Sequence, residues 1–241
     1  MLMAIRLSDR AVEPGVRMPA VTETIAMTVN RHPSERLDDL GDSALAVLEK
    51  AHQAREMALG ECRHVIRSCS VAIRSVHRSQ HEVALQNMAE AEVHLRSAQS
   101  VLSDHSVLAA SGFLHDAEKE YVEARSVWSM IHGETLGGFT DLGVEVAAWL
   151  CGLTEAASEL RRYLLDRMRE GDLERAQELF EMMEDIYGVL VTIDYPDALT
   201  GGLRRHVDAL RAVIERTRAD LTVTVLQAKL RARLEESLQS D

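Results

Sequence analysis

The placement of the prolines constrains the fold of this 241-residue chain more than any other feature of its sequence. The four prolines are Pro14, Pro19, Pro33 and Pro196. Residues 34–195 and 197–241 therefore contain none, and they are rich in Ala, Leu, Glu and Arg. Because proline inside a helix costs about 3 kcal/mol, such stretches are typical of helices. We predict a loose N-terminal tail over residues 1–33 and a helical domain over residues 34–241.

Glycines, serines and aspartates divide the helical domain into segments. They stand where a helix is expected to begin or end, as at Gly171-Asp172 and at Gly201-Gly202. The expected helices cover about residues 34–79, 81–103, 113–132, 140–170, 172–192 and 203–237. The alternation that predicts strands is confined to a short piece, Leu221–Val225, inside a helical context. The expected fold is an all-α bundle of six to seven antiparallel helices.

Composition narrows the class of protein. Hydrophobic residues make up 46% of the chain and charged residues 27%, which excludes disorder for most of it. No run of 18 apolar residues occurs, and the first ten residues already carry Arg6, Asp9 and Arg10, so we expect neither a membrane span nor a secretory signal. The three cysteines, Cys62, Cys69 and Cys151, are too few for a disulfide framework. We expect a cytoplasmic protein.

The net charge of −12 excludes a chain that is basic throughout, but it leaves room for a basic patch. On a helical projection four arginines fall within roughly 60° of one another and span about 22 Å. They are Arg63, Arg67, Arg74 and Arg78. A guanidinium group can form two parallel hydrogen bonds to one phosphate, a bidentate pair, so this arginine stripe fits a nucleic-acid backbone. The alternative is a solvated helix face without a ligand.

A carboxylate stands inside the apolar stripe expected for residues 113–132. Glu120 falls among residues such as Ala117, Tyr121 and Ala124, and Asp116 and Glu123 flank it. A carboxylate that faces apolar surroundings is costly unless a cation neutralises it. That cation is either a divalent metal ion or an arginine of another helix, and the pattern does not decide between them.

Two further carboxylates, Glu155 and Glu159, are one turn apart in the next expected helix. The apolar stripe of that helix lies on its far side, so by pattern alone they are ordinary surface residues. Two helices that each project paired carboxylates can nevertheless meet to hold Mg²⁺ for phosphodiester hydrolysis.

Several stretches of the chain resemble the translin superfamily, and in particular archaeal proteins similar to translin-associated factor X. The matching stretches are residues 62–67 (CRHVIR), 72–74 (AIR), 120–124 (EYVEA), 152–155 (GLTE), 158–160 (SEL) and 194–213, which begins DYP. Together they extend over about residues 36–235. The EYVEA stretch is the most specific of them.

The resemblance implies a protomer of seven helices that assembles into closed homo-oligomers, often octamers with an internal cavity. It implies binding of single-stranded RNA or DNA and endoribonuclease activity that depends on Mg²⁺ or Mn²⁺. The family's metal-binding, catalytic acids fall on Glu120, Glu123, Glu155 and Glu159. At residue 155 the family has Asp, and the longer Glu side chain can shift a metal ion.

Three functions remain open from the sequence. The first is a metal-dependent endoribonuclease that binds RNA through Arg63, Arg67, Arg74 and Arg78. The second is a non-catalytic nucleic-acid-binding oligomer of the translin type, which the change at residue 155 favours. A helical scaffold that binds no nucleic acid is the third, least informative alternative.

Overall fold

The computed structural model describes the backbone of residues 33–239 and the side chains of residues 36–239. The predicted tail over residues 1–33 lies outside this part, apart from Pro33. The described residues form helices and no strand, which confirms the all-α prediction. The helices are α1 (Pro33–His77), α2 (His81–Leu102), α3 (Ser106–Ala109), α4 (Phe113–His132), α5 (Phe139–Leu142), α6 (Val146–Glu170), α7 (Leu173–Leu190), α8 (Asp197–Thr200) and α9 (Leu203–Gln239).

The six long helices lie close to the expected ranges, and glycine stands at several of their boundaries. Gly133 and Gly171 end α4 and α6 with φ of 70° and 86°, a backbone region that side chains with a Cβ rarely adopt. The prediction of one helix over 140–170 was wrong at its start. Gly143 has φ of 58° and ends the four-residue α5, so that α6 begins only at Val146.

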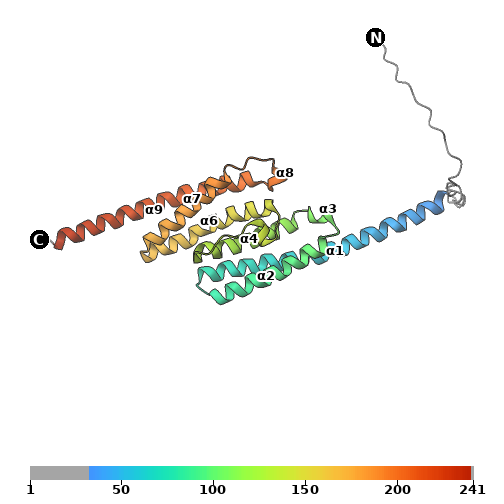
Figure 1. Cartoon of the computed structure of the whole chain (residues 1–241), viewed down its shortest axis with the longest axis horizontal. Helices are drawn as coiled ribbons and strands as arrows, with labels where there is room; N and C mark the ends of the chain where they lie inside the picture. Colours follow the sequence, from blue (N-terminus) through green and yellow to red (C-terminus); the bar gives the residue numbers. More distant parts are fainter. Residues whose placement is uncertain (1–32, 240–241) are drawn as a thin grey trace, which may run out of the picture. The chain divides into compact units, whose positions relative to one another are not determined.

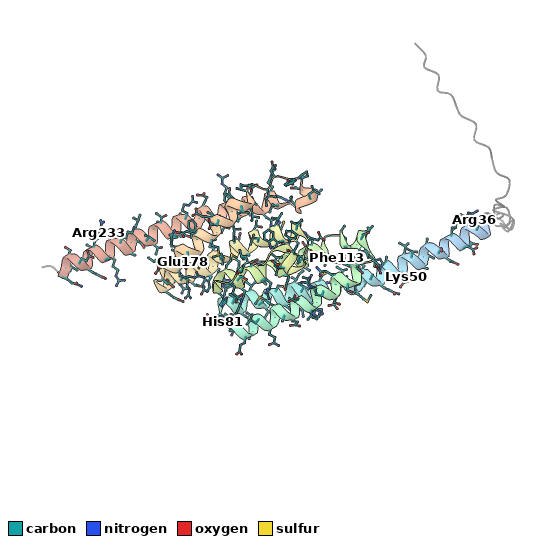
Figure 2. All side chains as sticks on the ribbon, in the orientation of Figure 1. Arg36, Lys50, His81, Phe113, Glu178 and Arg233 are labelled. Carbon is teal, nitrogen blue, oxygen red and sulfur yellow. The ribbon has the colours of Figure 1, made fainter. Side chains whose placement is uncertain are left out.

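The chain divides into two units, Met1–Leu48 and Glu49–Asp241. Of the first unit the structure describes the beginning of α1, where every described side chain is exposed, Arg36 among them (Figure 2). Among the described residues no helix combines the length and the apolar character that a membrane crossing needs.

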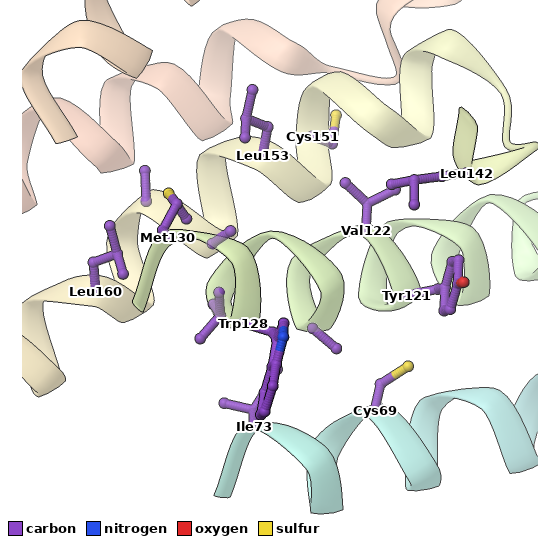
Figure 3. Packing of buried hydrophobic residues seen from close by; sticks show 14 of the residues in the cluster. Cys69, Ile73, Tyr121, Val122, Trp128, Met130, Leu142, Cys151, Leu153 and Leu160 are labelled. Carbon is purple, nitrogen blue, oxygen red and sulfur yellow. The ribbon is translucent and has the colours of Figure 1, made fainter. Parts of the chain in front are cut away.

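The second unit contains the hydrophobic core. Helix α6 packs against α4, α7, α8 and α9, and α4 also packs against α2. Figure 1 shows α4 and α6 in the middle of this unit, with α2 on one side and α7 and α9 on the other. Figure 3 shows the core around them, with Cys69 of α1 facing α4 and Val122 lying between α4 and α6.

Two contacts fix how α4 and α6 lie against each other. Glu118 of α4 is buried and accepts hydrogen bonds from the Gln99 side chain (2.7 Å) and from the backbone nitrogen of Glu145 (3.1 Å), the residue before α6. Farther along α6, Gly152 lies directly against the backbone of α4. A Cβ at Gly152 would stand 2.6 Å from the carbonyl oxygen of Lys119. This second contact brings the two helices together next to the predicted carboxylates.

Candidate metal centre

Three of the four predicted carboxylates meet between α4 and α6. Glu120, Glu123 and Glu155 each offer one carboxylate oxygen, and these oxygens all lie within 4.8 Å of one another. All three side chains are half-buried. Oxygens bound to one octahedral Mg²⁺ ion lie about 2.9 Å apart when adjacent and about 4.2 Å apart when opposite, so the three carboxylates must move closer together to hold such an ion. We call these three residues the carboxylate cluster.

Glycine at position 152 explains why Glu155 belongs to this cluster. Residues three apart project from the same side of a helix. Because Gly152 faces α4 at van der Waals distance, Glu155 also faces α4, where Glu120 and Glu123 lie. The sequence pattern alone had placed Glu155 on the surface.

Two nitrogen-bearing side chains, Lys119 and His206, contact the cluster at Glu155. Nζ of Lys119 is 2.7 Å from Oε1 of Glu155 and 4.0 Å from Oε1 of Glu120. Nδ1 of His206, on α9, is 3.4 Å from the same oxygen of Glu155. Burial alone would lower the pKa of Lys119, but the hydrogen bond and charge of Glu155 outweigh it and raise that pKa. The ammonium group is therefore charged at neutral pH.

Glu123 has no such partner. Among the described residues no lysine, arginine or histidine nitrogen lies within ion-pair distance of its carboxylate. Burial, and then the negative charges of Glu120 and Glu155, raise its pKa from 4.5 to about 8. Burial also raises the pKa of Glu120. The three carboxylates therefore cannot all ionise at neutral pH without a further cation, which is the condition that favours a bound metal ion.

Glu159 lies next to the cluster but outside it. Its Oε1 is 2.7 Å from Nε2 of His77, whose side chain is 1% exposed, and 3.9 Å from Nη1 of Arg162. Its charge contributes to the raised pKa of Glu123, so the two side chains are close. The structure therefore brings together Glu120, Glu123 and Glu155 and places Glu159 behind them, against the end of α1.

The arginine stripe lies on a different face of the molecule. Arg63, Arg67, Arg74 and Arg78 are all exposed, and none has an ion pair with any carboxylate that the structure describes. Arg67 and Arg74 are two residues before and five residues after Cys69, so they project from the opposite side of α1. Cys69 is buried toward the cluster, since burial and the charges of Glu120 and Glu123 raise its pKa. Within one protomer the stripe and the cluster do not meet.

Sequence reasoning missed three residues of this centre. Lys119 and His206 contact Glu155, and His77 contacts Glu159. Only Lys119 carried a signal: it is one of three lysines in a chain with 24 arginines, and it stands beside Glu120. The contacts of the two histidines are long-range and follow from packing alone.

The chain is similar to known proteins over most of its length, although no family model matches it. The crystal structure of AfC3PO is 32% identical to this chain and has a TM-score of 0.71. The match covers 77% of this chain and 97% of the AfC3PO chain. C3PO proteins are members of the translin family. This chain belongs to the translin superfamily.

Three further known proteins or structures are similar to the chain. A structure of AfC3PO in complex with duplex RNA is 33% identical to this translin-superfamily protein, with a TM-score of 0.63, over 77% of this chain and 96% of that chain. The crystal structure of apo-NeC3PO is 20% identical, with a TM-score of 0.68 over 80% and 98% of the two chains, and shows the same fold. An uncharacterized protein of Methanocaldococcus jannaschii is 27% identical over 189 residues, which are 78% of this chain and 83% of that protein.

Proposed function

We propose that this translin-superfamily protein is a metal-dependent endoribonuclease that assembles into a closed homo-oligomer. The observation that carries the proposal is the carboxylate cluster, in which three oxygens from two helices lie within 4.8 Å of one another. The complex of the relative AfC3PO with duplex RNA supports RNA as the ligand. Membership of the branch of translin-associated factor X, and cleavage of single-stranded RNA, are parts of the same proposal.

The donor set fits a hard divalent cation. Carboxylate oxygens are the ligands that Mg²⁺ and Mn²⁺ prefer, and Glu120, Glu123 and Glu155 would supply them. When bound, the ion supplies positive charge for the scissile phosphate and lowers the pKa of a water nucleophile. Because the pKa of Glu123 is about 8, Glu123 releases a proton when it becomes a ligand near neutral pH.

The remaining residues have separate tasks in this proposal. Glu159 contributes negative charge and is held in place by His77. The arginine stripe binds phosphates of the RNA strand, for which its exposed guanidinium groups, which form no ion pair with a described carboxylate, are suited. Ligand residues and phosphate-binding residues are therefore different, and substitutions can separate cleavage from binding.

A cleavage assay tests the proposal. Labelled single-stranded RNA and duplex RNA are incubated with the full chain in Mg²⁺, in Mn²⁺ and in EDTA. We expect cleavage only with a divalent ion, and we expect Glu123→Ala to abolish it while RNA affinity and helix content stay unchanged. Asp185→Ala, which removes an exposed carboxylate of α7, is the matched control and should cleave like the wild type. Full activity of Glu123→Ala would refute the site.

One observation favours the second function, a non-catalytic RNA-binding protein. Oε1 of Glu155 is already in contact with Lys119 and His206, and the residue replaces the family's Asp. In that case the wild type binds RNA and no divalent ion produces cleavage.

The proposal of an oligomer rests on apolar side chains that are exposed to solvent in a single protomer. Toward the end of α9 four leucines recur every four residues and are all more than half exposed: Leu226, Leu230, Leu234 and Leu238. A long apolar helix face in water favours association. Light scattering that returned the protomer mass of 26.8 kDa at micromolar concentration would contradict this part of the proposal.

A further inference from the structure

Lys119 occupies an unusual place for a lysine in this chain. Its side chain is 17% exposed, and its ammonium group lies between two members of the carboxylate cluster, 2.7 Å from Glu155 and 4.0 Å from Glu120. The other two lysines, Lys50 and Lys229, are exposed. The chain has 24 arginines and only three lysines, so the cationic residue beside the carboxylate cluster is of the rarer type.

We infer that Lys119 is the resident counter-ion of the carboxylate cluster, and that it competes with a divalent metal ion for Glu155 and thereby sets the metal affinity of the site. This inference rests on the proposed function, since it assumes that the cluster binds a metal ion. It goes beyond that function because it assigns the control of metal occupancy to a residue that is not itself a ligand.

The charges of the cluster support this role. Once Glu123 has released its proton to become a ligand, the three carboxylates carry a charge of −3. Lys119 reduces this to −2, which one divalent ion neutralises. Lys119 lies within ion-pair distance of Glu155 and Glu120. Among the described residues Glu123 has no cation at that distance, and the charge of Lys119 is the last of the effects on its pKa. A metal ion therefore gains the most favourable binding free energy beside Glu123. To bind Glu155 as well, the ion must share that carboxylate with Lys119 or displace the lysine from it.

The geometry also allows the exchange. The backbone of Lys119 is fixed, because its carbonyl oxygen lies at the closest contact of α4 with Gly152. Its side chain, in contrast, is a flexible four-carbon stem with a point charge at its end. His206 lies 3.4 Å from the same carboxylate oxygen, so Glu155 still has one neighbouring nitrogen when the ammonium group leaves.

A purely structural ion pair would behave differently. If Lys119 served only to join α4 and α6, its removal would lower stability and leave the metal affinity unchanged or weaker. If it competes with the metal ion, its removal tightens metal binding, because one positive charge next to the ion disappears. For a divalent ion a few ångströms away in a half-buried site, we expect an increase in affinity of about tenfold or more.

The test compares metal binding by the full chain and its variants without RNA. Mn²⁺ is titrated into wild type, Lys119→Met and Lys119→Arg, and binding is followed by calorimetry and by the electron paramagnetic resonance signal of free Mn²⁺. We expect Lys119→Met to bind Mn²⁺ about tenfold more tightly, and Lys119→Arg, which keeps the charge, to bind no more tightly than wild type. Lys229→Met removes an exposed lysine of α9 and should leave the affinity unchanged.

The melting temperature gives a second measurement on the same samples. Without metal, Lys119→Met should melt below wild type, because three carboxylates then face one another without a neighbouring lysine. Saturating Mn²⁺ should raise its melting temperature by more than it raises that of wild type.

The outcomes separate the two proposals. A wild-type chain that binds no divalent ion overturns both the metal centre and the role of Lys119. Equal Mn²⁺ affinity of wild type and Lys119→Met, with both folded, overturns the role of Lys119 and leaves the metal centre standing. Tighter binding by Lys119→Arg as well would also overturn it, because the effect would then not depend on charge.

Discussion

Replacement of Gly152 by alanine tests whether the contact of α4 with α6 builds the carboxylate cluster. A Cβ at this position would lie 2.6 Å from the carbonyl oxygen of Lys119 and 2.7 Å from Cβ of Val122. Neither atom is the end of a flexible side chain, so relief of the clash requires the two helices to move apart. Since Glu155 is one turn from Gly152, the same movement separates Glu155 from Glu120 and Glu123.

The free energy of unfolding changes through two opposing effects. Overpacking of a buried contact costs typically about 1–3 kcal/mol, and contact with rigid backbone places Gly152→Ala at the upper end. Alanine in a helix interior is about 1 kcal/mol better than glycine. The net loss is then about 2 kcal/mol, which for a chain of this size lowers the melting temperature by about 4–8 °C.

The assay is thermal unfolding of both proteins in EDTA, followed by Mn²⁺ titration. Gly188→Ala is the control, because Gly188 lies in α7 with no atom within 4 Å of an added Cβ, and its replacement should raise stability slightly. We also expect Gly152→Ala to bind Mn²⁺ more weakly than wild type. A Gly152→Ala variant that is as stable as Gly188→Ala would refute the argument that this close contact determines the site.

Two more predictions follow from the charges. The pKa of Glu123 is about 8 in the folded protein against 4.5 for a free side chain, so the unfolded state loses this proton first and wild type loses stability as pH rises from about 4.5 to 8. In EDTA, Glu123→Gln should therefore lose less stability over that range, by about 1 kcal/mol or more; equal pH profiles in denaturant titrations would contradict this. Replacing Arg63 and Arg74 together by alanine should weaken RNA binding and reduce the slope of log affinity against log salt by about 1–2 units; an unchanged slope would show that the stripe is only solvated.

Helix positions could be predicted because local residues determine them. Proline and glycine act within one turn of their own position, so Gly133, Gly171 and Pro196 indicate helix ends without knowledge of the fold. The exception, the break between α5 and α6, depends on Gly143 in a left-handed conformation that the sequence does not reveal.

The site was only partly predictable because other helices pack against two sides of α4, so that α4 has no single buried face. A helical projection assumes one apolar face, and on this assumption Glu120 was the misplaced carboxylate of the helix. In the structure α4 packs against both α2 and α6, and the fully covered carboxylate is Glu118, which is 2% exposed. Contacts between helices, such as those of Lys119 and His77, lie outside what periodicity can reveal.

The opposite placement of stripe and cluster leads to a last prediction about the oligomer. Arg67 and Arg74 project from the side of α1 opposite Cys69, and Cys69 faces Glu120 and Glu123. We predict that an RNA strand held on the stripe of one protomer is cut at the cluster of another copy.

If so, the two defects complement each other. Glu123→Ala chains supply an intact stripe, and Arg63→Ala/Arg74→Ala chains supply an intact cluster. When the two variants are refolded together, mixed oligomers contain sites in which both parts are intact, and Mg²⁺-dependent cleavage should exceed the sum of the two variants assayed separately. Each variant refolded alone is the control, at a salt concentration where the arginine variant does not bind RNA. Cleavage no greater than that sum, with mixed oligomers demonstrated by mass, would mean that each protomer cuts the RNA that its own stripe binds.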